Sequence, residues 1–247
     1  MTTWTVEFLQ PQDASESGSD RALIILNQPF SEELFYRLWT SSQWHCCADG
    51  GANRLFDILA AAQRPLFLPD LIKGDLDSIR DDVKEFYLSH VYSPSLTSAF
   101  FTKYVPSSTS LSSRIRTRTR PTLMKCVAAI SDKEAHEQNE YDVVLLGGLR
   151  GNASFAVTDD NVGWVLDAGE HTIHIDHSVL GPTCGLLPVG IASTVLSTTG
   201  LRWNLSNHES SFDGLMSTSN HVLPDEGSVW IKTSNPIWWT VELRSRV

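Results

Sequence analysis

The chain has 247 residues, 41% of them hydrophobic, which is enough for one large domain or two ordinary domains with a real core. Its 19 basic and 29 acidic residues give a net charge of −10, which argues against a general binder of nucleic acid or anionic membranes and implies that phosphates would be handled through metal ions. Four cysteines without metal-ligand spacing, no secretory signal and no membrane-length apolar run predict a cytoplasmic protein with reduced thiols and no membrane partner.

The first half of the chain alternates predicted strands with predicted helices. A polar lead-in at residues 1–20 comes first. Continuous apolar runs then predict strands at 22–27, 44–48 and 66–72, and apolar residues at helical spacing predict helices at 31–39, 53–60 and 81–87. This alternation is typical of a parallel sheet with crossover helices, whose ligands gather at the carboxyl ends of the strands. We therefore expect an α/β domain at residues 21–152.

Two site-like turns follow predicted strands. In Gly74-Asp75-Leu76-Asp77-Ser78, an extended backbone would point Asp75 and Asp77 the same way, toward one hard cation, while Leu76 turns into the core and Gly74 lets a ligand approach. An ordinary surface turn is the alternative for so short a motif. The second turn, ADGGANR at residues 48–54, also lies between an apolar run and a helix. Together the turns predict one phosphate and metal site.

The stretch at residues 92–121 is unlike its surroundings. It is rich in Ser and Thr, carries Lys103 and four arginines, and contains no acid. This composition predicts a disordered loop, with a phosphate-binding or phosphorylated insert as the alternative. A helix at 123–130 and a buried strand at 141–146 follow, and the strand ends in a glycine-rich turn at 147–151.

The second half has the pattern of an antiparallel β-sandwich at residues 153–247. Short alternating stretches separated by turn residues predict strands at 155–158, 164–166, 171–175, 194–198, 201–205, 228–232 and 238–243. Its tryptophans are most simply explained as core residues. His171, His174 and His177 recur at a spacing of three, but side chains on a strand at that spacing need not converge on a metal.

Seven segments together resemble the thiamine pyrophosphokinase family, eukaryotic type. They occur in the family's order in both halves of the chain: ADGGANR at 48–54, PDLIKGDLDSI at 69–79, LGGL at 146–149, GPTCGLLP at 181–188, TGLRWNL at 199–205, STSN at 217–220 and PIWWT at 236–240. The resemblance implies transfer of a pyrophosphoryl group from ATP to thiamine, which gives thiamine diphosphate and AMP. It also implies a catalytic α/β domain, a thiamine-binding sandwich and a homodimer whose thiamine pocket is shared between subunits.

The resemblance also implies roles for particular residues. Asp75 and Asp77 match the magnesium-binding pair, and the same turn contributes Gly74 and Ser78 to the nucleotide side. Asp49, Asn53 and Arg54 match the turn beside the nucleotide phosphates, and Asp49 is also a candidate to help activate the thiamine hydroxyl. The residues that match the thiamine side are Ser217, Ser219, Asn220 and Trp239.

Two departures from the family pattern bear on activity. A Gln-Asp-x-x-Thr-Asp-Phe-x-Lys type motif is expected before residue 141, but only TLMKC at 122–126 resembles its end, and no Asp stands at the expected place. After Gly151, an Arg-x-Asp motif and the following helix are missing. These departures predict an incomplete α/β domain. They leave two alternatives open: a catalytically impaired homologue that binds thiamine or thiamine diphosphate, and the product of a mis-spliced gene prediction.

Overall fold

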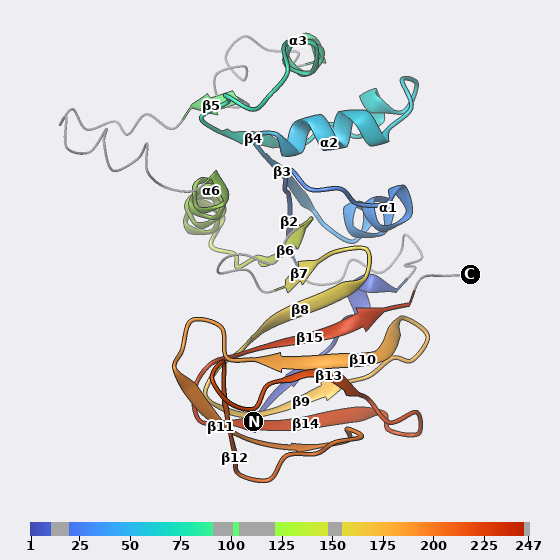
Figure 1. The fold of residues 1–247 in the computed structure, drawn as a ribbon. Helices are drawn as coiled ribbons and strands as arrows, with labels where there is room; N and C mark the ends of the chain where they lie inside the picture. The colour runs from blue at the N-terminus through green and yellow to red at the C-terminus, as the bar shows by residue number, and fades with distance from the viewer. Residues whose placement is uncertain (11–19, 91–100, 104–121, 148–154, 245–247) are drawn as a thin grey trace, which may run out of the picture. The chain divides into compact units, whose positions relative to one another are not determined.

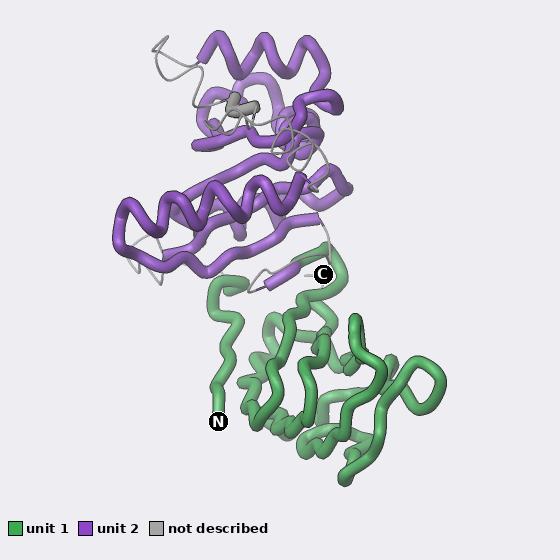
Figure 2. Tube along the Cα trace, turned by 90° about the vertical axis from the view of Figure 1, so that its left-hand side faces the viewer, with its two compact units in different colours: residues 1–11, 157–247 green, residues 12–156 purple. Residues whose placement is uncertain are grey.

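A computed structural model describes residues 1–10, 20–90, 101–103, 122–147 and 155–244. The chain divides into two compact units, shown in two colours in Figure 2. Unit 1 is formed by residues 1–11 and 157–247, and unit 2 by residues 12–156. The second half of the chain thus folds together with the N-terminus.

Unit 2 is built on a parallel sheet. Five strands follow one another in the order β6 (Asp142–Leu146), β2 (Arg21–Ile25), β3 (Trp44–Ala48), β4 (Leu71–Gly74) and β5 (Phe101–Lys103), and every neighbouring pair is parallel. The central strand β2 is buried along its whole length, as its continuous apolar sequence predicts for a strand covered on both faces. The predicted α/β class is confirmed.

Helices cover both faces of this sheet. Figure 1 shows α1 (Glu32–Thr40) and α2 (Gly51–Ile58) on one side and α6 (Thr122–Glu137) on the other, while α3 (Asp81–His90) follows β4. The short 3-10 helix η2 (Arg64–Leu66) precedes β4. Helix α1 begins after Ser31, whose Oγ accepts a hydrogen bond from the Leu34 N–H at 3.3 Å, and it buries Leu34, Phe35 and Leu38 as its spacing predicts.

The expected incompleteness of this domain does not extend to the parallel core. The five strands form a continuous sheet with helices on both faces. The second departure from the family pattern lies in the connection after β6, where residues 147–154 alone precede β7 (Phe155–Val157), the next strand in the order. A parallel crossover needs a dozen or more residues, so this connection is too short for one. Of the predicted glycine turn, only Gly147 lies within the described residues, and it has a positive φ of 87°.

Within the basic stretch at 92–121, the described residues form a strand that composition did not predict. Residues 101–103 form β5 and pair in parallel with β4, Ile72 lying opposite Phe101. The pairing with β4 supplies backbone hydrogen bonds that an isolated segment lacks. A prediction from local composition cannot include this contribution, so it does not identify such a strand. The remainder of the stretch lies outside the described residues.

Unit 1 is the predicted sandwich. One sheet has the order β1 (Thr2–Trp4), β9 (Gly169–His174), β14 (Ser228–Thr233), β11 (Ser193–Thr199) and β12 (His208–Ser211). The other strands of unit 1 follow the order β13 (Ser217–His221), β10 (Leu180–Leu187), β15 (Ile237–Leu243) and β8 (Asn161–Leu166). Trp164 and Trp239 lie opposite each other on β8 and β15 and are fully buried, which confirms a tryptophan-containing core.

The strand expected at residues 201–205 is absent from the structure, because this segment forms a turn with a single bridge from Leu201 to Val222. The side chain of Asn204 accepts a hydrogen bond from the Leu201 N–H at 3.1 Å, which favours a turn over an extended strand.

The N-terminal residues are not only a polar lead-in. Strand β1 pairs in parallel with β9, and the Trp4 Nε1 donates a hydrogen bond to His171 Nδ1 at 3.1 Å. The following 3-10 helix η1 (Glu7–Leu9) buries Phe8 and Leu9. These few apolar side chains anchor the segment, although its average composition is polar. Among the described helices, none is long and apolar enough to span a membrane.

Candidate active site

Three polar segments meet at the carboxyl edge of the parallel sheet in unit 2. Asn27 lies two residues after β2, Asp49 directly follows β3, and Asp75 directly follows β4. A Cβ atom added at Gly51, the first residue of α2, would lie 2.1 Å from the carbonyl oxygen of Ile25. Only glycine therefore lets the start of α2 pack this closely against the end of β2.

Asp49 and Asp75 form the acidic centre of this edge. Asp49 is buried, and its Oδ1 has no hydrogen-bond partner among the described residues. Burial, together with the adjoining Asp75 carboxylate, raises the pKa of Asp49 to about 6. The pKa of Asp75 is lowered, first by a hydrogen bond from its own backbone N–H and further by Lys125. Two adjoining carboxylates cannot both be charged at low cost unless a cation joins them.

The acidic turn is not the extended segment that we expected. Leu76 has a φ of 65°, in the left-handed region that a branched apolar residue rarely adopts, and it is only half-buried. The backbone therefore turns between the two carboxylates, and the Asp77 side chain is exposed. Asp77 still acts on Asp49 electrostatically, since its charge contributes to the raised pKa of Asp49.

Gly74, the last residue of β4, lies close to the side chain of Asp49. A Cβ atom there would lie 2.8 Å from the Cβ of Asp49 and 3.2 Å from the Cγ2 of Thr122, the first residue of α6. The absence of a side chain thus makes room for Asp49. The notion that Gly74 admits a ligand to the backbone stays a prediction.

Asn53 and Ser78 form a brace between α2 and the acidic turn. The Asn53 Nδ2 donates to the Ser78 carbonyl oxygen at 2.7 Å, and its Oδ1 accepts from the Arg80 N–H at 3.1 Å. The Ser78 N–H in turn interacts with Asp49. The side chain of Asn53 is therefore engaged in holding the turn.

Arg54 extends from α2 into solvent beside this brace. Its Nε donates a hydrogen bond to Asn27 Oδ1 at 3.1 Å. This bond uses one donor of the guanidinium and orients the rest of the planar group. Arg54 is thus held at the carboxyl edge by Asn27, a residue that the sequence interpretation missed.

The second missed residue is Lys125. It lies on α6, its side chain is 7% exposed, and its Nζ is 3.7 Å from Asp75 Oδ1. A lysine within the mainly apolar run LMKCVAAI at 123–130 is the signal that could have identified it, because a charged residue on a buried helix face needs a partner.

The residues expected on the thiamine side lie on two strands of unit 1. Ser217 and Trp239 both face Leu186 of β10, on opposite sides of that strand. Trp239 has no exposed surface in the single chain, whereas Ser219 is exposed. The structure therefore brings these residues into neighbouring strands but offers no free face of the Trp239 ring.

Asn220 is buried and has a structural role in the single chain. Its Nδ2 donates to the Trp203 carbonyl oxygen at 2.8 Å and to Ser217 Oγ at 3.2 Å, and its Oδ1 accepts from the Trp203 N–H at 3.2 Å. These bonds fix the turn at residues 201–205. The exposed indole of Trp203 lies on this turn, with the Arg202 guanidinium 4.9 Å from its ring centre.

His171, His174 and His177 do not converge on one point. His171 is buried between Trp4 and the Asp167 carbonyl oxygen, and His177 bonds to the Glu226 carbonyl oxygen. No group of three potential metal-binding side chains occurs within the described part of the chain. Any metal bound by Asp49, Asp75 and Asp77 would thus need ligand oxygens from elsewhere, such as phosphates.

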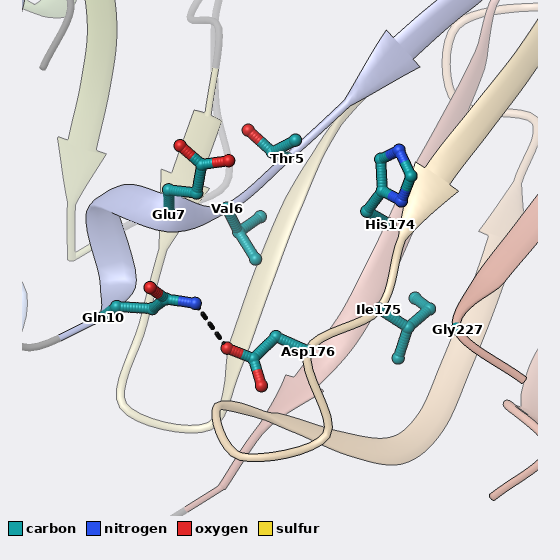
Figure 3. Close-up of a pocket in the computed structure, with 8 residues that line it drawn as sticks. All are labelled: Thr5, Val6, Glu7, Gln10, His174, Ile175, Asp176 and Gly227. Carbon is teal, nitrogen blue, oxygen red and sulfur yellow. Dashed lines mark hydrogen bonds between the residues drawn. The ribbon is translucent and has the colours of Figure 1, made fainter. Parts of the chain in front are cut away.

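Unit 1 also contains a pocket of about 380 Å³ between η1 and the end of β9. Figure 3 shows Glu7 and His174 at its rim and the hydrogen bond from Gln10 Nε2 to Asp176 Oδ2 across it, at 2.5 Å. None of the predicted site residues lines this pocket. All of its lining residues belong to unit 1.

Comparison with known proteins matches both halves of the chain. A sequence profile described as "Thiamin pyrophosphokinase, catalytic domain" matches residues 35–159, and one described as "Thiamin pyrophosphokinase, vitamin B1 binding domain" matches residues 170–238. Thiamine pyrophosphokinase 3 of Oryza sativa subsp. japonica is 36% identical over 254 residues, which cover 92% of this chain and 88% of that protein. The chain belongs to the thiamin pyrophosphokinase family.

Other members of the thiamin pyrophosphokinase family agree over nearly the whole length. Thiamine pyrophosphokinase 1 of Arabidopsis thaliana is 32% identical, covering 96% of this chain and 91% of that protein. The crystal structure of yeast thiamin pyrophosphokinase superposes with a TM-score of 0.71 at 24% identity and covers 98% of this chain and 91% of that one. The structure from Candida albicans gives a TM-score of 0.69. The catalytic-domain profile includes Asp49 and Asp75, and the vitamin B1 binding profile ends one residue before Trp239.

Proposed function

We propose that this chain is a thiamine pyrophosphokinase, which transfers the pyrophosphoryl group of ATP to the hydroxyl group of thiamine and releases thiamine diphosphate and AMP. The observation that carries the proposal is the meeting of Asp49 and Asp75 at the carboxyl edge of the parallel sheet, within the part of the chain that matches the family's catalytic domain. Ligands of open α/β sheets bind at this edge.

The acidic edge suits a magnesium ion. The buried Oδ1 of Asp49 has no hydrogen-bond partner among the described residues, and the Asp49 carboxylate adjoins that of Asp75. A hard cation that takes oxygen ligands would bind to this Oδ1 and would offset the repulsion between the two carboxylates. We propose Asp75 and Asp77 as its protein ligands, with Asp49 beside them. When bound, magnesium would offset the negative charge that builds on the transferred group.

The remaining residues of the edge would position the nucleotide. Arg54, held by Asn27, presents an oriented guanidinium that suits the paired oxygens of a phosphate. Asn53, Gly74 and Ser78 set the shape of the acidic turn on the nucleotide side. The unpartnered Oδ1 of Asp49 is available to accept the proton of the thiamine hydroxyl, which makes Asp49 a candidate catalytic residue as well.

The thiamine side is proposed to include Ser217, Ser219, Asn220 and Trp239 of unit 1. Support comes from the match of residues 170–238 to the vitamin B1 binding domain. Because Trp239 is covered and Asn220 is engaged in the single chain, Ser217 and Ser219 are the members of this set with accessible side chains. We further propose a homodimer, as the family resemblance implies, and a cytoplasmic location, in keeping with four unpaired cysteines.

The activity is tested by incubating the purified chain with radiolabelled ATP, Mg²⁺ and thiamine. We expect labelled AMP and thiamine diphosphate in equal amounts, and no AMP when thiamine is omitted. Asp75→Asn should lower the rate by about 100-fold or more, because alignment and charge compensation dominate phosphoryl transfer. Formation of ADP in place of AMP would contradict the pyrophosphoryl step.

A second candidate is a protein that binds thiamine or thiamine diphosphate without turnover. It is favoured by the lack of any acid at residues 92–121, before α6. Calorimetric thiamine binding with no AMP release would support this function, and measurable turnover would exclude it.

A further inference from the structure

His171 of β9 uses both ring nitrogens in hydrogen bonds within unit 1. Its Nδ1 accepts a hydrogen bond from the Trp4 Nε1 at 3.1 Å, and its Nε2 lies 2.8 Å from the carbonyl oxygen of Asp167. An indole N–H can only donate and a carbonyl oxygen can only accept, so these partners fix the ring as the neutral tautomer with its proton on Nε2. The His171 side chain is only 3% exposed, so water does not readily replace a lost partner.

The bond from Trp4 to His171 joins the N-terminal strand to the sandwich. Trp4 is the last residue of β1, an edge strand that pairs with β9 over only three residues. Its indole also packs against the buried ring of Trp164 on β8, with 5.8 Å between the ring centres. Because the pairing is so short, the contacts of this one side chain contribute much of what holds β1 on β9.

Protonation of the His171 ring would remove this bond. An imidazolium carries an N–H on both nitrogens, so Nε2 would keep its bond to the Asp167 carbonyl oxygen while the new proton on Nδ1 faced the indole N–H of Trp4. Two donors cannot bond to each other, and a buried donor without an acceptor is costly. Histidine is the side chain that ordinarily gains a proton between about pH 6 and pH 7.

The other charges around His171 lie on the surrounding strands and turns. The residues directly opposite His171, Thr2 on β1 and Ile231 on β14, are uncharged, and β8 contains no charged residue. The titratable or charged groups of β1, β9, β14 and the adjoining turns are the Met1 ammonium, Glu7, Asp167, Glu170, His174 and Lys232. Glu170 is adjacent to His171 and so points to the opposite face of β9, where it pairs with Lys232 at 2.9 Å. Direct contact with Trp4 therefore distinguishes the neutral ring from the protonated one.

We propose that His171 is a pH-sensitive switch for the docking of β1. The neutral ring holds Trp4, whereas the protonated ring releases it, so β1 loses its side-chain bond to β9 in mildly acidic solution. Because Phe8 and Leu9 anchor η1 separately, we expect the change to be confined to β1. The alternative is a purely structural bond, in which His171 stays neutral in acid and Trp4 stays bound. The inference does not rest on the proposed function.

The test follows the Trp4 indole N–H and the His171 ring by NMR in the full chain, labelled at tryptophan and histidine, between about pH 8 and pH 5. Trp4→Phe and His171→Gln assign the two signals by removing them. Once His171 is protonated, the Trp4 N–H should exchange with water about 10-fold faster, the effect of one lost hydrogen bond. The rate is expressed relative to the indole N–H of Trp203, which is 53% exposed and supplies the intrinsic pH dependence of exchange.

His171→Gln separates the two alternatives, because its amide can accept from Trp4 and donate to the Asp167 carbonyl oxygen but does not titrate. The Trp4 N–H of this variant should stay protected throughout the range. His177→Gln is the matched control, since His177 lies in the same unit but bonds to the Glu226 carbonyl oxygen, and this variant should respond like the wild type.

Three results would overturn the inference. They are a His171 ring that stays neutral down to about pH 5, a Trp4 signal that does not follow the protonation of that ring, and a His171→Gln variant that keeps the wild-type response. Urea unfolding shows whether the variants are folded. If His171→Gln does not fold, the wild-type titration decides by itself, because it reports both rings in one sample.

Discussion

The side-chain amide of Asn53 donates a hydrogen bond to the carbonyl oxygen of Ser78 at 2.7 Å and so connects α2 to the acidic turn. Asn53→Ala removes this bond and the one accepted from the Arg80 N–H. We expect the free energy of unfolding to fall by about 1–2 kcal/mol. The rate of AMP release should fall by about 10- to 100-fold, because the turn that carries Asp75 and Asp77 loses its brace.

Gln63→Ala is the matched control for this variant. Gln63 also makes two hydrogen bonds in unit 2, to the Tyr36 hydroxyl and from the Ala60 N–H, but it does not contact the acidic turn. It should lose similar stability in urea unfolding while keeping its turnover. Equal losses of turnover in both variants would show that Asn53 acts only through stability.

Asn27 and Arg54 are expected to act as one unit. Arg54→Met should raise the KM for ATP by about 10- to 100-fold with a smaller effect on kcat, since it removes a charged phosphate contact. Asn27→Ala should raise the same KM less, because it leaves the guanidinium in place but unoriented. The double variant should be no worse than Arg54→Met alone, and multiplied effects would contradict this coupling. Arg37→Met, which removes an ion pair with Glu33 on α1, should leave the KM unchanged.

Asp57 and Arg80 should show a pH-dependent coupling. Two hydrogen bonds, at 2.6 and 2.7 Å, join the guanidinium to the carboxylate, and these bonds lower the pKa of Asp57. Since the folded pKa lies below the unfolded one, the stabilisation is present above about pH 4 and is lost as the pH falls through the folded pKa. Both side chains are nearly half exposed, so the coupling should be only about 0.5–1 kcal/mol.

A double-mutant cycle of Asp57→Asn and Arg80→Met measures this coupling by urea unfolding. It should be present at about pH 7, shrink in concentrated NaCl and decline as the pH is lowered below about 4. A coupling that does not change as the pH is lowered would mean that charge does not hold the pair together.

Gly51→Ala tests the contact between α2 and β2. The added methyl group would lie 2.1 Å from the Ile25 carbonyl oxygen, so the helix has to move away from the strand. We expect a loss of about 3 kcal/mol or more in the free energy of unfolding, together with loss of activity. Gly227→Ala is the control, because no atom lies within 4 Å of its added Cβ, and thermal unfolding should show it close to wild type.

The parts of the fold that follow local rules could be predicted from the sequence. Strand β3 has the predicted bounds, and α1 buries the predicted face, because apolar runs and helical spacing depend on residues close together in the chain. Strand β10 was missed for the same reason. Its sequence contains Gly181, Pro182 and Gly185, which are unfavourable in a strand, and it is held by pairing with β13 and β15 on either side.

Some features of the candidate site could likewise be predicted from the sequence, whereas others depend on the tertiary structure. The sequence alone determined that Asp49 and Asp75 follow strands and that the chain carries the segments of its family. Turn motifs and the order of strands along the chain depend only on residues that are close together in the sequence. Only the tertiary structure decided that Leu76 turns the backbone between the carboxylates and that Asn27 holds Arg54. It alone placed Lys125 beside Asp75, fifty positions away in the sequence. Such contacts depend on how helices pack across a sheet, and no local pattern encodes that distance.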